Sequence, residues 1–271
     1  MNIASMGKGK LVSAHEYQVE KHGAKLFCID CKSPIIFISA SENTMPHFKT
    51  TGKGDSSHKK SCGFARKLSF EESLKKIGQY QQEYLEKNLD QVIIKLNLAR
   101  LDPDYETKAT ERVQKLQNTS EIIIKTDSSS SPKSISSLKT VVKLIQENQL
   151  ELLASIIIRV KGESIPLSQL IISPEEAYNL IKNREKKTPY FVYGTISKFI
   201  KREKVYYLNF ESQQPFSLVV FEKNFKHFTY TENQLLGRRI LAYGYLQRNT
   251  YKGERAEMII KSNKYIELLP L

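Results

Sequence analysis

The stretch that decides the fold is "VYGTISKFIKREKVYYLNF", residues 192–210, near the C-terminal end of this 271-residue chain. Its second half alternates between two faces, with Val205, Tyr207 and Asn209 on one and Tyr206, Leu208 and Phe210 on the other. Alternation with a period of two is typical of a β-strand with one face buried. The basic segment "KFIKREK", residues 198–204, separates this strand from an apolar run before it. The stretch therefore predicts two consecutive strands joined by a basic loop.

Further strand signals follow to the end of the chain. They are "FSLVVFE" at 216–222, "RRILAYGYLQ" at 238–247 and "AEMIIKS" at 256–262, with a partly helical link at 223–237 after the third strand. Five strands with a helix-like connector after the third is the element order of an OB-fold barrel. Gly194 and Gly244 fall in the first and fourth strands, where a small barrel bends sharply. We expect an OB-fold domain over residues 188–271.

This region also resembles a known family. Residues 192–228, "VYGTISKFIKREKVYYLNFESQQPFSLVVFEKNFKHF", and 235–268, "LLGRRILAYGYLQRNTYKGERAEMIIKSNKYIEL", are similar to the nucleic-acid-binding OB domains of bacterial nucleases and to tRNA-anticodon-type modules. The shared elements include a "YLNF" second strand, a "VVF" third strand and "YKGERAEM" leading into the fifth. The resemblance implies a protein that binds single-stranded nucleic acid.

The residue types in this region support the same function. OB modules stack bases on aromatic rings while lysine and arginine follow the phosphates. The candidate binding residues are Lys198, Lys201, Arg202, Lys204, Tyr206, Tyr207, Arg238, Arg239, Tyr245, Arg248, Tyr251, Lys252 and Arg255. One of Tyr206 and Tyr207 is expected to face the barrel interior. Docking of a protein on the same face is the alternative use of such a surface.

Composition limits the partners of the whole chain. The formal charge of +13 and the pI of about 9.4 attract polyanions, which include nucleic acid, acidic membrane surfaces and acidic proteins. No apolar run approaches the length of about 18 residues that a bilayer crossing needs. The N-terminal segment has no signal-peptide apolar core. We expect a cytoplasmic protein in a reducing setting. Its expected partners are single-stranded DNA or RNA, with a protein as a further candidate, and no membrane.

All three cysteines lie in one N-terminal window. Cys28 and Cys31 form a Cys-x-x-Cys turn, which supplies two of the four tetrahedral ligands that zinc prefers. His58 and Cys62 complete the pattern C-x2-C-x26-H-x3-C, and His47 is an alternative fourth ligand. Four protein ligands would leave no open position, so the predicted zinc is structural. The competing interpretation is a pair of buried thiols beside a solvated basic loop.

The same window resembles the zinc-binding segment of competence CoiA-like and related bacterial proteins. In that family a Cys-x-x-Cys knuckle is followed by a His-Phe pair and by later histidine and cysteine. The matching residues are "CIDC" at 28–31, "HF" at 47–48 and the later His58 and Cys62. Thr50 stands where that family has a second histidine.

The chain as a whole predicts an α+β multidomain protein. Residues 1–125 form a zinc-binding module with a helix from Ser69 to about Arg100, opened by a Ser69/Glu72 capping box and followed by a weaker helix within 104–125. The Ser-rich segment 126–137, "TDSSSSPKSISS", predicts a linker. Residues 138–187 predict a helical connector, with a second helix opening at Ser173 and Pro174.

Known catalytic motifs are missing from the chain. "PDYETK" at 103–108 resembles a PD-(D/E)-x-K nuclease site, but both of its acidic elements fall within one short segment. The sequence thus favours a binding protein over an enzyme and leaves the question open. We expect a bacterial or phage protein that binds single-stranded nucleic acid, DNA in preference, with low sequence specificity, as an accessory subunit in replication, repair or phage defence. The alternatives are a nuclease or nuclease accessory factor, and a protein-docking adaptor.

Overall fold

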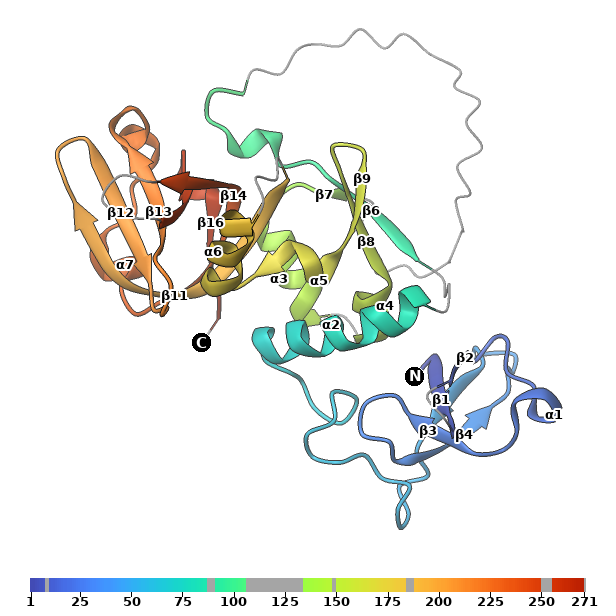
Figure 1. Ribbon diagram of the computed structural model, residues 1–271. Helices are drawn as coiled ribbons and strands as arrows, with labels where there is room; N and C mark the ends of the chain where they lie inside the picture. The colour runs from blue at the N-terminus through green and yellow to red at the C-terminus, as the bar shows by residue number, and fades with distance from the viewer. Residues whose placement is uncertain are drawn as a thin grey trace, which may run out of the picture. The chain divides into compact units, whose positions relative to one another are not determined.

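The computed structural model of the chain describes residues 1–7, 10–86, 91–105, 134–147, 150–183, 188–249 and 255–270. The chain divides into two compact units (Figure 1). The N-terminal unit comprises Met1–Gln91 and Ile145–Ser155, and the C-terminal unit comprises Val92–Leu144 and Ile156–Leu271. Sheets and mostly short helices alternate along the described residues, which confirms the α+β class. Among the described helices, none combines the length and apolar composition that crossing a bilayer requires.

The N-terminal unit contains an antiparallel sheet with the strand order β2-β1-β3-β4-β5. Its strands are β1 Ile3–Met6, β2 Lys10–Ser13, β3 Leu26–Cys28, β4 Pro34–Ile38 and β5 His47–Lys49, and the short helix α1 Val19–His22 follows β2. Alternate strand residues such as Ala4, Val12, Leu26 and Phe48 are buried together with the three cysteines. The cysteines are thus part of this small core.

Helix α2, Phe70–Glu86, begins at the predicted capping box. The backbone N–H of Glu72 donates to Oγ of Ser69, and the backbone N–H of Ser69 donates to Oε2 of Glu72. Phe70, Leu74 and Ile77 recur at helical spacing and are buried. The helix is described as far as Glu86, and residues 92–96 form a strand, so the prediction of a helix that reaches about Arg100 is wrong. The β-branched run that follows forms strand β6, Val92–Leu96, because it pairs with another strand of the C-terminal unit.

Helix α4, Leu150–Ser155, packs against α2 and belongs to the N-terminal unit. Its Glu151 carboxylate accepts hydrogen bonds from the backbone N–H groups of Asn2 at 2.7 Å and Ile3 at 3.1 Å. The residue is 5% exposed. Burial raises the pKa of the Glu151 carboxyl above its ordinary value. One buried carboxylate therefore joins α4 to the start of the first strand.

The C-terminal unit begins with a sheet of strand order β7-β6-β8-β9. The segment predicted as a helical connector contains both helices and strands, namely α3 Leu138–Glu147, α4, β8 Ile156–Val160, β9 Glu163–Pro166, α5 Leu167–Leu170, β10 Ile171–Ile172 and α6 Pro174–Asn183. The predicted cap of α6 is confirmed, since Oγ of Ser173 accepts the N–H of Glu176. The isoleucine run at 156–158 favours a strand because it is buried against β6.

Two sequence predictions fall largely outside the described residues. They are the second helix within 104–125 and the linker at 126–137, of which only the last residues are described. Ser134 and Ile135 form the short strand β7, which pairs in parallel with β6. The 3-10 helix η2, Ala99–Leu101, follows β6.

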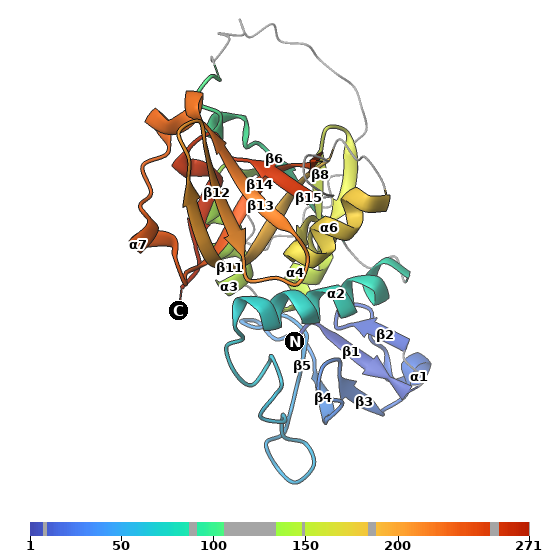
Figure 2. The same cartoon turned by 60° about the vertical axis from the view of Figure 1, so that its left-hand side comes forward.

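Five strands at the C-terminal end pair in a cycle (Figure 2). They are β11 Pro189–Lys201, β12 Val205–Phe210, β13 Phe216–Phe221, β14 Arg239–Asn249 and β15 Arg255–Ile259. The order of pairing is β11-β12-β13-β15-β14, and β14 also pairs with β11. The β13–β15 pair is parallel and the others are antiparallel. Two further strands pair with this cycle: β10 pairs with β11, and β16, Ile266–Leu268, pairs with β14. The connection from β13 to β14 contains η3 Glu222–His227 and α7 Glu232–Leu235.

The cycle of strands encloses a core made of its alternate residues. Leu208, Leu218 and Met258 are fully buried there, and Ala177 and Ile181 of α6 belong to the same cluster. A Cβ at Gly194 would lie 2.8 Å from the Phe210 ring, and one at Gly244 would lie 2.7 Å from Cγ of Met258. The two glycines thus leave space for neighbouring core side chains.

Candidate metal centre and candidate nucleic-acid interface

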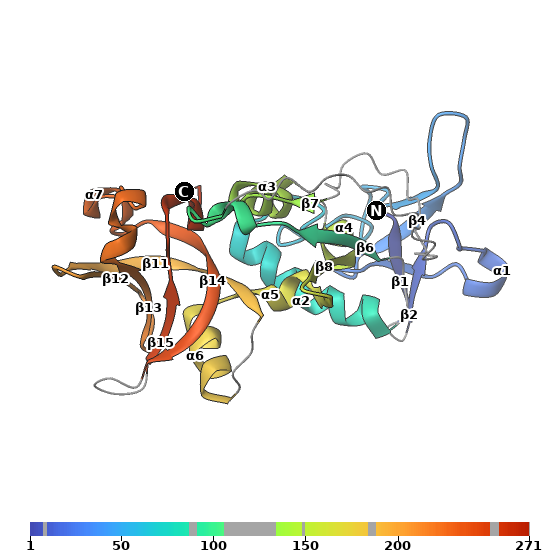
Figure 3. The ribbon, with the colours of Figure 1, turned by 90° about the horizontal axis from the view of Figure 1, so that it is seen from above.

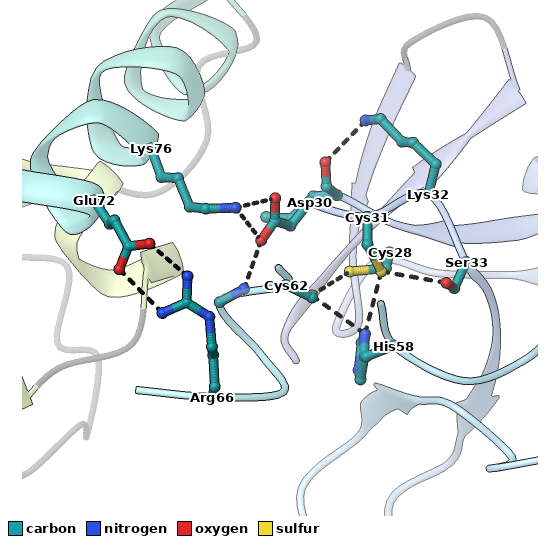
Figure 4. Close-up of polar contacts among 12 residues, drawn as sticks. Cys28, Asp30, Cys31, Lys32, Ser33, His58, Cys62, Arg66, Glu72 and Lys76 are labelled. Carbon is teal, nitrogen blue, oxygen red and sulfur yellow. Dashed lines mark hydrogen bonds and ion pairs between the residues drawn. The ribbon is translucent and has the colours of Figure 1, made fainter. Parts of the chain in front are cut away.

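Three cysteines and one histidine of the N-terminal unit converge on one point (Figure 4). Cys28 ends β3, Cys31 lies in the turn that follows, and His58 and Cys62 come from the loop before α2. The ligand atoms of the four residues all lie within 4.8 Å of one another. We call these four residues the Cys3His cluster.

The distances within the Cys3His cluster fit a single ion. Sγ of Cys28 lies 3.8 Å from Sγ of Cys62, and Nδ1 of His58 lies 3.5 Å from Sγ of Cys31 and 3.4 Å from Sγ of Cys62. A tetrahedral zinc site has bonds of about 2.3 Å to sulfur and about 2.0–2.1 Å to nitrogen, which place two sulfurs about 3.8 Å apart and a sulfur and a nitrogen about 3.6 Å apart. The four residues are therefore positioned to bind one metal ion.

Backbone hydrogen bonds shape the turn that carries Cys31. The N–H of Cys28 donates to the carbonyl of Ser33 at 2.8 Å, and the N–H of Lys32 donates to the carbonyl of Cys28 at 3.0 Å. Lys32 has a φ of 58°, a left-handed conformation that is uncommon for a residue other than glycine. This tight turn returns Cys31 to the side of Cys28. On the other segment, the N–H of Cys62 donates to the carbonyl of Lys59, which brings Cys62 back beside His58.

His47 lies outside the Cys3His cluster. It begins β5 and pairs with Ile38, and its Nδ1 lies 2.9 Å from the carbonyl oxygen of Met45. Of the two histidines considered as a fourth ligand, the geometry selects His58. Phe64 stacks on the His58 ring with centroids 6.1 Å apart, which helps to fix the orientation of the imidazole.

The thiols of the Cys3His cluster differ in acidity. Contact with Cys62 lowers the pKa of Cys28, and the same contact raises the pKa of Cys62. Burial raises the pKa of Cys31, but hydrogen bonds with Ser33 and His58 outweigh it and lower that pKa to about 5. The surroundings therefore lower the pKa of two of the three cysteines before any cation adds its own charge.

Asp30 holds the two halves of the site together, and the sequence did not single it out. Its Oδ2 accepts the backbone N–H of Gly63 at 2.6 Å, and both carboxylate oxygens accept from Nζ of Lys76 in α2 (Figure 4). Burial alone would raise the pKa of Asp30, but the bonds from Lys76 and Gly63 lower it. The signal that could have identified this residue is a carboxylate inside the "CIDC" turn, because ligand-bearing segments are commonly held by partners outside the ligand set.

The basic loop between β11 and β12 is exposed. Arg202 and Lys204 lie in it, and Lys198 and Lys201 precede it on β11. The side chains of Lys198 and Ile200 share a face of the sheet with their cross-strand partners Asn209 and Tyr207. Ile200 is 37% exposed, which identifies this as the outer face. Arg202 and Lys204 therefore lie beside the start of β12, and Lys198 lies on its outer face near its end. Lys201 lies on the other face, with its Nζ over the Phe199 and Tyr206 rings.

Tyr206 and Tyr207 point to opposite sides of β12. Tyr206 packs against the core, with its ring stacked on Phe225 at a centroid distance of 3.9 Å and an interplanar angle of 8°. Tyr207 lies on the outer face, half-buried, with Cζ of Arg202 5.9 Å from its ring centroid. The expectation that one of the two tyrosines faces inward is met, and Tyr207 is the one available to a ligand.

The remaining predicted residues lie elsewhere on the strand cycle. Arg238 and Arg239 stand at the start of β14, and Tyr245 lies further along β14 beneath Nζ of Lys161 at 4.6 Å. Arg248 and Arg255 lie near the β14–β15 connection, at the far end of β12 and β13 from the basic loop. Tyr251 and Lys252 are outside the described residues. The described members of the predicted set thus come from β11, β12, β14, β15 and the segments next to them.

Comparison with known proteins was made for the whole chain. No protein-family model and no curated protein matches it. One matching solved structure is the S. pombe Stn1–Ten1 complex, with 19% sequence identity and a TM-score of 0.25. The match covers 31% of this chain and 59% of that one, so this chain spans less than two thirds of its length.

Proposed function

We propose that the protein binds single-stranded nucleic acid on the outer face of β12 and β13, and that the five-strand cycle carrying this face is an OB-fold barrel. The strand order, in which the third strand pairs in parallel with the fifth and the fourth returns to the first, supports this fold. The basic loop and the paired ends of β14 and β15, at Asn249 and Arg255, lie at opposite ends of that face. A strand crossing the face would pass between them.

The observation that carries the proposal is Tyr207 on the outer face, beside the exposed basic loop. An outward-facing ring offers a stacking platform for a base, and Lys198, Arg202 and Lys204 are placed to follow the phosphates. Stacking accepts any base, because every base has a π face. We therefore propose low sequence specificity, with DNA as the preferred polymer.

Zinc is the ion we propose for the Cys3His cluster. Thiolate and imidazole ligands in a tetrahedral arrangement favour zinc over magnesium or calcium, which prefer oxygen ligands. Four protein ligands leave no open position, so the ion would hold the N-terminal unit together rather than activate water. A reducing cytoplasmic setting suits the three free thiols.

Binding of labelled oligo-dT and oligo-U to the metal-loaded chain tests the proposal. We expect Tyr207→Ala to weaken binding by about tenfold, since loss of one stacked base costs about 1–3 kcal/mol. Tyr105→Ala, which removes a tyrosine that is 48% exposed, is the matched control and should bind as the wild type does. Equal affinity of wild type and Tyr207→Ala would contradict the proposal. Adding Mg²⁺ to the same reactions and examining the strand length tests the nuclease alternative.

A protein-docking adaptor is a second candidate, because Ile200 and Phe221 are 37% and 40% exposed on the face that carries Tyr207. Apolar groups among cations are typical of protein interfaces as well. The dependence of binding affinity on salt concentration distinguishes the two functions. Binding to phosphates weakens steeply as salt rises, through counterion release, whereas apolar docking does not.

A further inference from the structure

A second basic site lies in the C-terminal unit, away from the proposed binding face. It is a cavity of about 350 Å³ lined by Arg100, Leu101, Ser136, Ser137, Leu138, Lys139, Lys264 and Glu267. These residues come from η2, the start of α3, the 3-10 helix η4 Asn263–Tyr265, and β16. Figure 3 shows α3, β7 and the C-terminal end of the chain on one side of this unit. The volume lies in the range of small-ligand sites.

The cavity carries a net positive charge. Three of its lining side chains are cationic and one is a carboxylate, which leaves a net charge of +2. Burial raises the pKa of the Glu267 carboxyl, and the positive charge of Lys139 acts in the opposite direction. Within the described part of the chain, Arg100 and Lys264 have neither a hydrogen bond nor an ion pair from their side chains. Their donors are therefore available to an anion.

The segments that carry the cations are fixed to one another. Nζ of Lys261 pairs with Oδ2 of Asp102, two residues after Arg100. Oγ of Ser262 donates to the carbonyl of Leu101 at 3.0 Å, and that bond is buried. The lining residues Leu101 and Leu138 are buried, as is Ile266 next to Glu267. The separation between Arg100 and Lys264 is thus set by packing and not by the side chains alone.

We propose that this cavity binds a phosphate monoester. Such a group carries a charge of about −1.5 to −2 at pH 7, which matches the net charge of the cavity, and offers three acceptor oxygens. The three cations supply charge-assisted donors, and the hydroxyl of Ser136 adds a neutral one. The phosphate could belong to a free nucleotide or to the end of a nucleic-acid strand, since both present the same chemical group. This site is independent of the face around Tyr207.

Calorimetric titration of the metal-loaded chain with AMP tests the inference. We expect AMP to bind, adenosine to give no signal and inorganic phosphate to compete with AMP. The double variant Arg100→Gln/Lys264→Gln should bind AMP at least about tenfold more weakly, because it removes two charge-assisted hydrogen-bond donors. Lys223→Gln/Lys226→Gln removes two exposed lysines of η3 and is the charge-matched control. It should bind AMP as the wild type does.

Three results would overturn the inference: adenosine binding as well as AMP, unchanged affinity in the double variant, or equal loss in the control variant. Binding of oligo-dT with and without a terminal phosphate identifies the source of the phosphate group. If the terminal phosphate raises the affinity for oligo-dT and the double variant loses this increase, the ligand is a strand end. If AMP binds but the terminal phosphate does not raise the affinity for oligo-dT, the ligand is a free nucleotide. Tyr207→Ala should leave AMP binding unchanged, so failure of the nucleic-acid proposal and failure of this one are separable.

Discussion

The carboxylate of Asp30 accepts hydrogen bonds from Nζ of Lys76 at 2.5 and 2.6 Å, which ties the turn between two cysteines to helix α2. The side chains are 10% and 20% exposed, so the pair is largely shielded from water. Asp30 also accepts the N–H of Gly63, the residue after Cys62. Both segments of the Cys3His cluster therefore depend on one carboxylate outside the ligand set.

Replacing this carboxylate should weaken metal binding without removing a ligand. Asp30→Asn keeps the size of the side chain but loses the ionic bond to Lys76, which we expect to cost roughly 2–3 kcal/mol. Changes in groups that support ligands commonly lower metal affinity by about 10–100-fold. Competition for zinc with a chromophoric chelator measures the affinity. Glu71→Gln, which removes one negative charge from the first turn of α2 at a residue that is not part of the Cys3His cluster, is the control. Unchanged zinc affinity in Asp30→Asn would show that the pair is not needed by the site.

Removal of the metal should affect the N-terminal unit selectively. The small core there consists partly of the three cysteines, so loss of the ion leaves thiolates close together without a cation. We expect a chelator to unfold the sheet β1–β5 while the five-strand cycle stays folded. Hydrogen exchange resolved along the chain measures this. Protection lost equally in both units would contradict it.

The choice between the two histidines can be tested directly. We expect Cys62→Ser and His58→Ala to reduce the bound metal strongly, and His47→Ala to retain it, since His47 lies outside the cluster. Cobalt substitution reports both content and geometry, because thiolate ligation of a tetrahedral Co²⁺ gives strong visible absorption. Loss of that absorption in His47→Ala, with His58→Ala intact, would reverse the assignment.

Two glycines of the strand cycle should be intolerant of a methyl group. Gly194→Ala places Cβ 2.8 Å from the Phe210 ring, a distance at which the core must shift, and overpacking of this kind costs about 1–3 kcal/mol. Gly78→Ala in α2 is the matched control, since nothing lies within 4 Å of its added Cβ and alanine favours a helix by about 1 kcal/mol. Urea unfolding of both variants measures the difference. A Gly194→Ala protein as stable as the wild type would show that the core has room.

Local sequence patterns predicted the elements whose formation depends on residues close together in the chain. The alternation in 205–210 identified β12, the Ser69/Glu72 box placed the start of α2, and Ser173 placed the start of α6. The Cys-x-x-Cys turn identified half of the Cys3His cluster for the same reason, because two intervening residues fix the separation of the thiols. His58 could be named only as one of two choices, since its place depends on how a long loop returns to the turn.

Long-range packing decided what the sequence did not predict. The run at 92–96 continues the helical pattern of α2, yet pairing with β8 makes it a strand, so tertiary contacts outweigh local propensity there. Arg238, Tyr245 and the basic loop all offer cationic or aromatic side chains. Only the pairing register shows that they lie at different points along β11, with Tyr245 beside Pro189, Arg238 beside Ile196 and the basic loop after Lys201. The cavity at Arg100 and Lys264 joins residues far apart in the chain and left no sequence signal.

The pH dependence of stability should carry a contribution from Glu151. Its folded pKa is raised by burial above the ordinary value of 4.5, so between the two values the folded state binds more protons than the unfolded state. The contribution of Glu151 to the free energy of unfolding is therefore fully present below about pH 4.5 and falls as pH rises through the folded pKa.

Glu151→Gln keeps an acceptor for one of the two backbone N–H groups and cannot ionise. We expect the wild type to exceed this variant in free energy of unfolding most at the acidic end, with the difference shrinking toward pH 8. Urea titrations of both proteins in the same metal-saturated buffer, from pH 5.5 to 8, measure that difference. A difference that stays constant or grows with pH would mean that the carboxylate is stabilised, rather than penalised, by its place beneath Asn2 and Ile3.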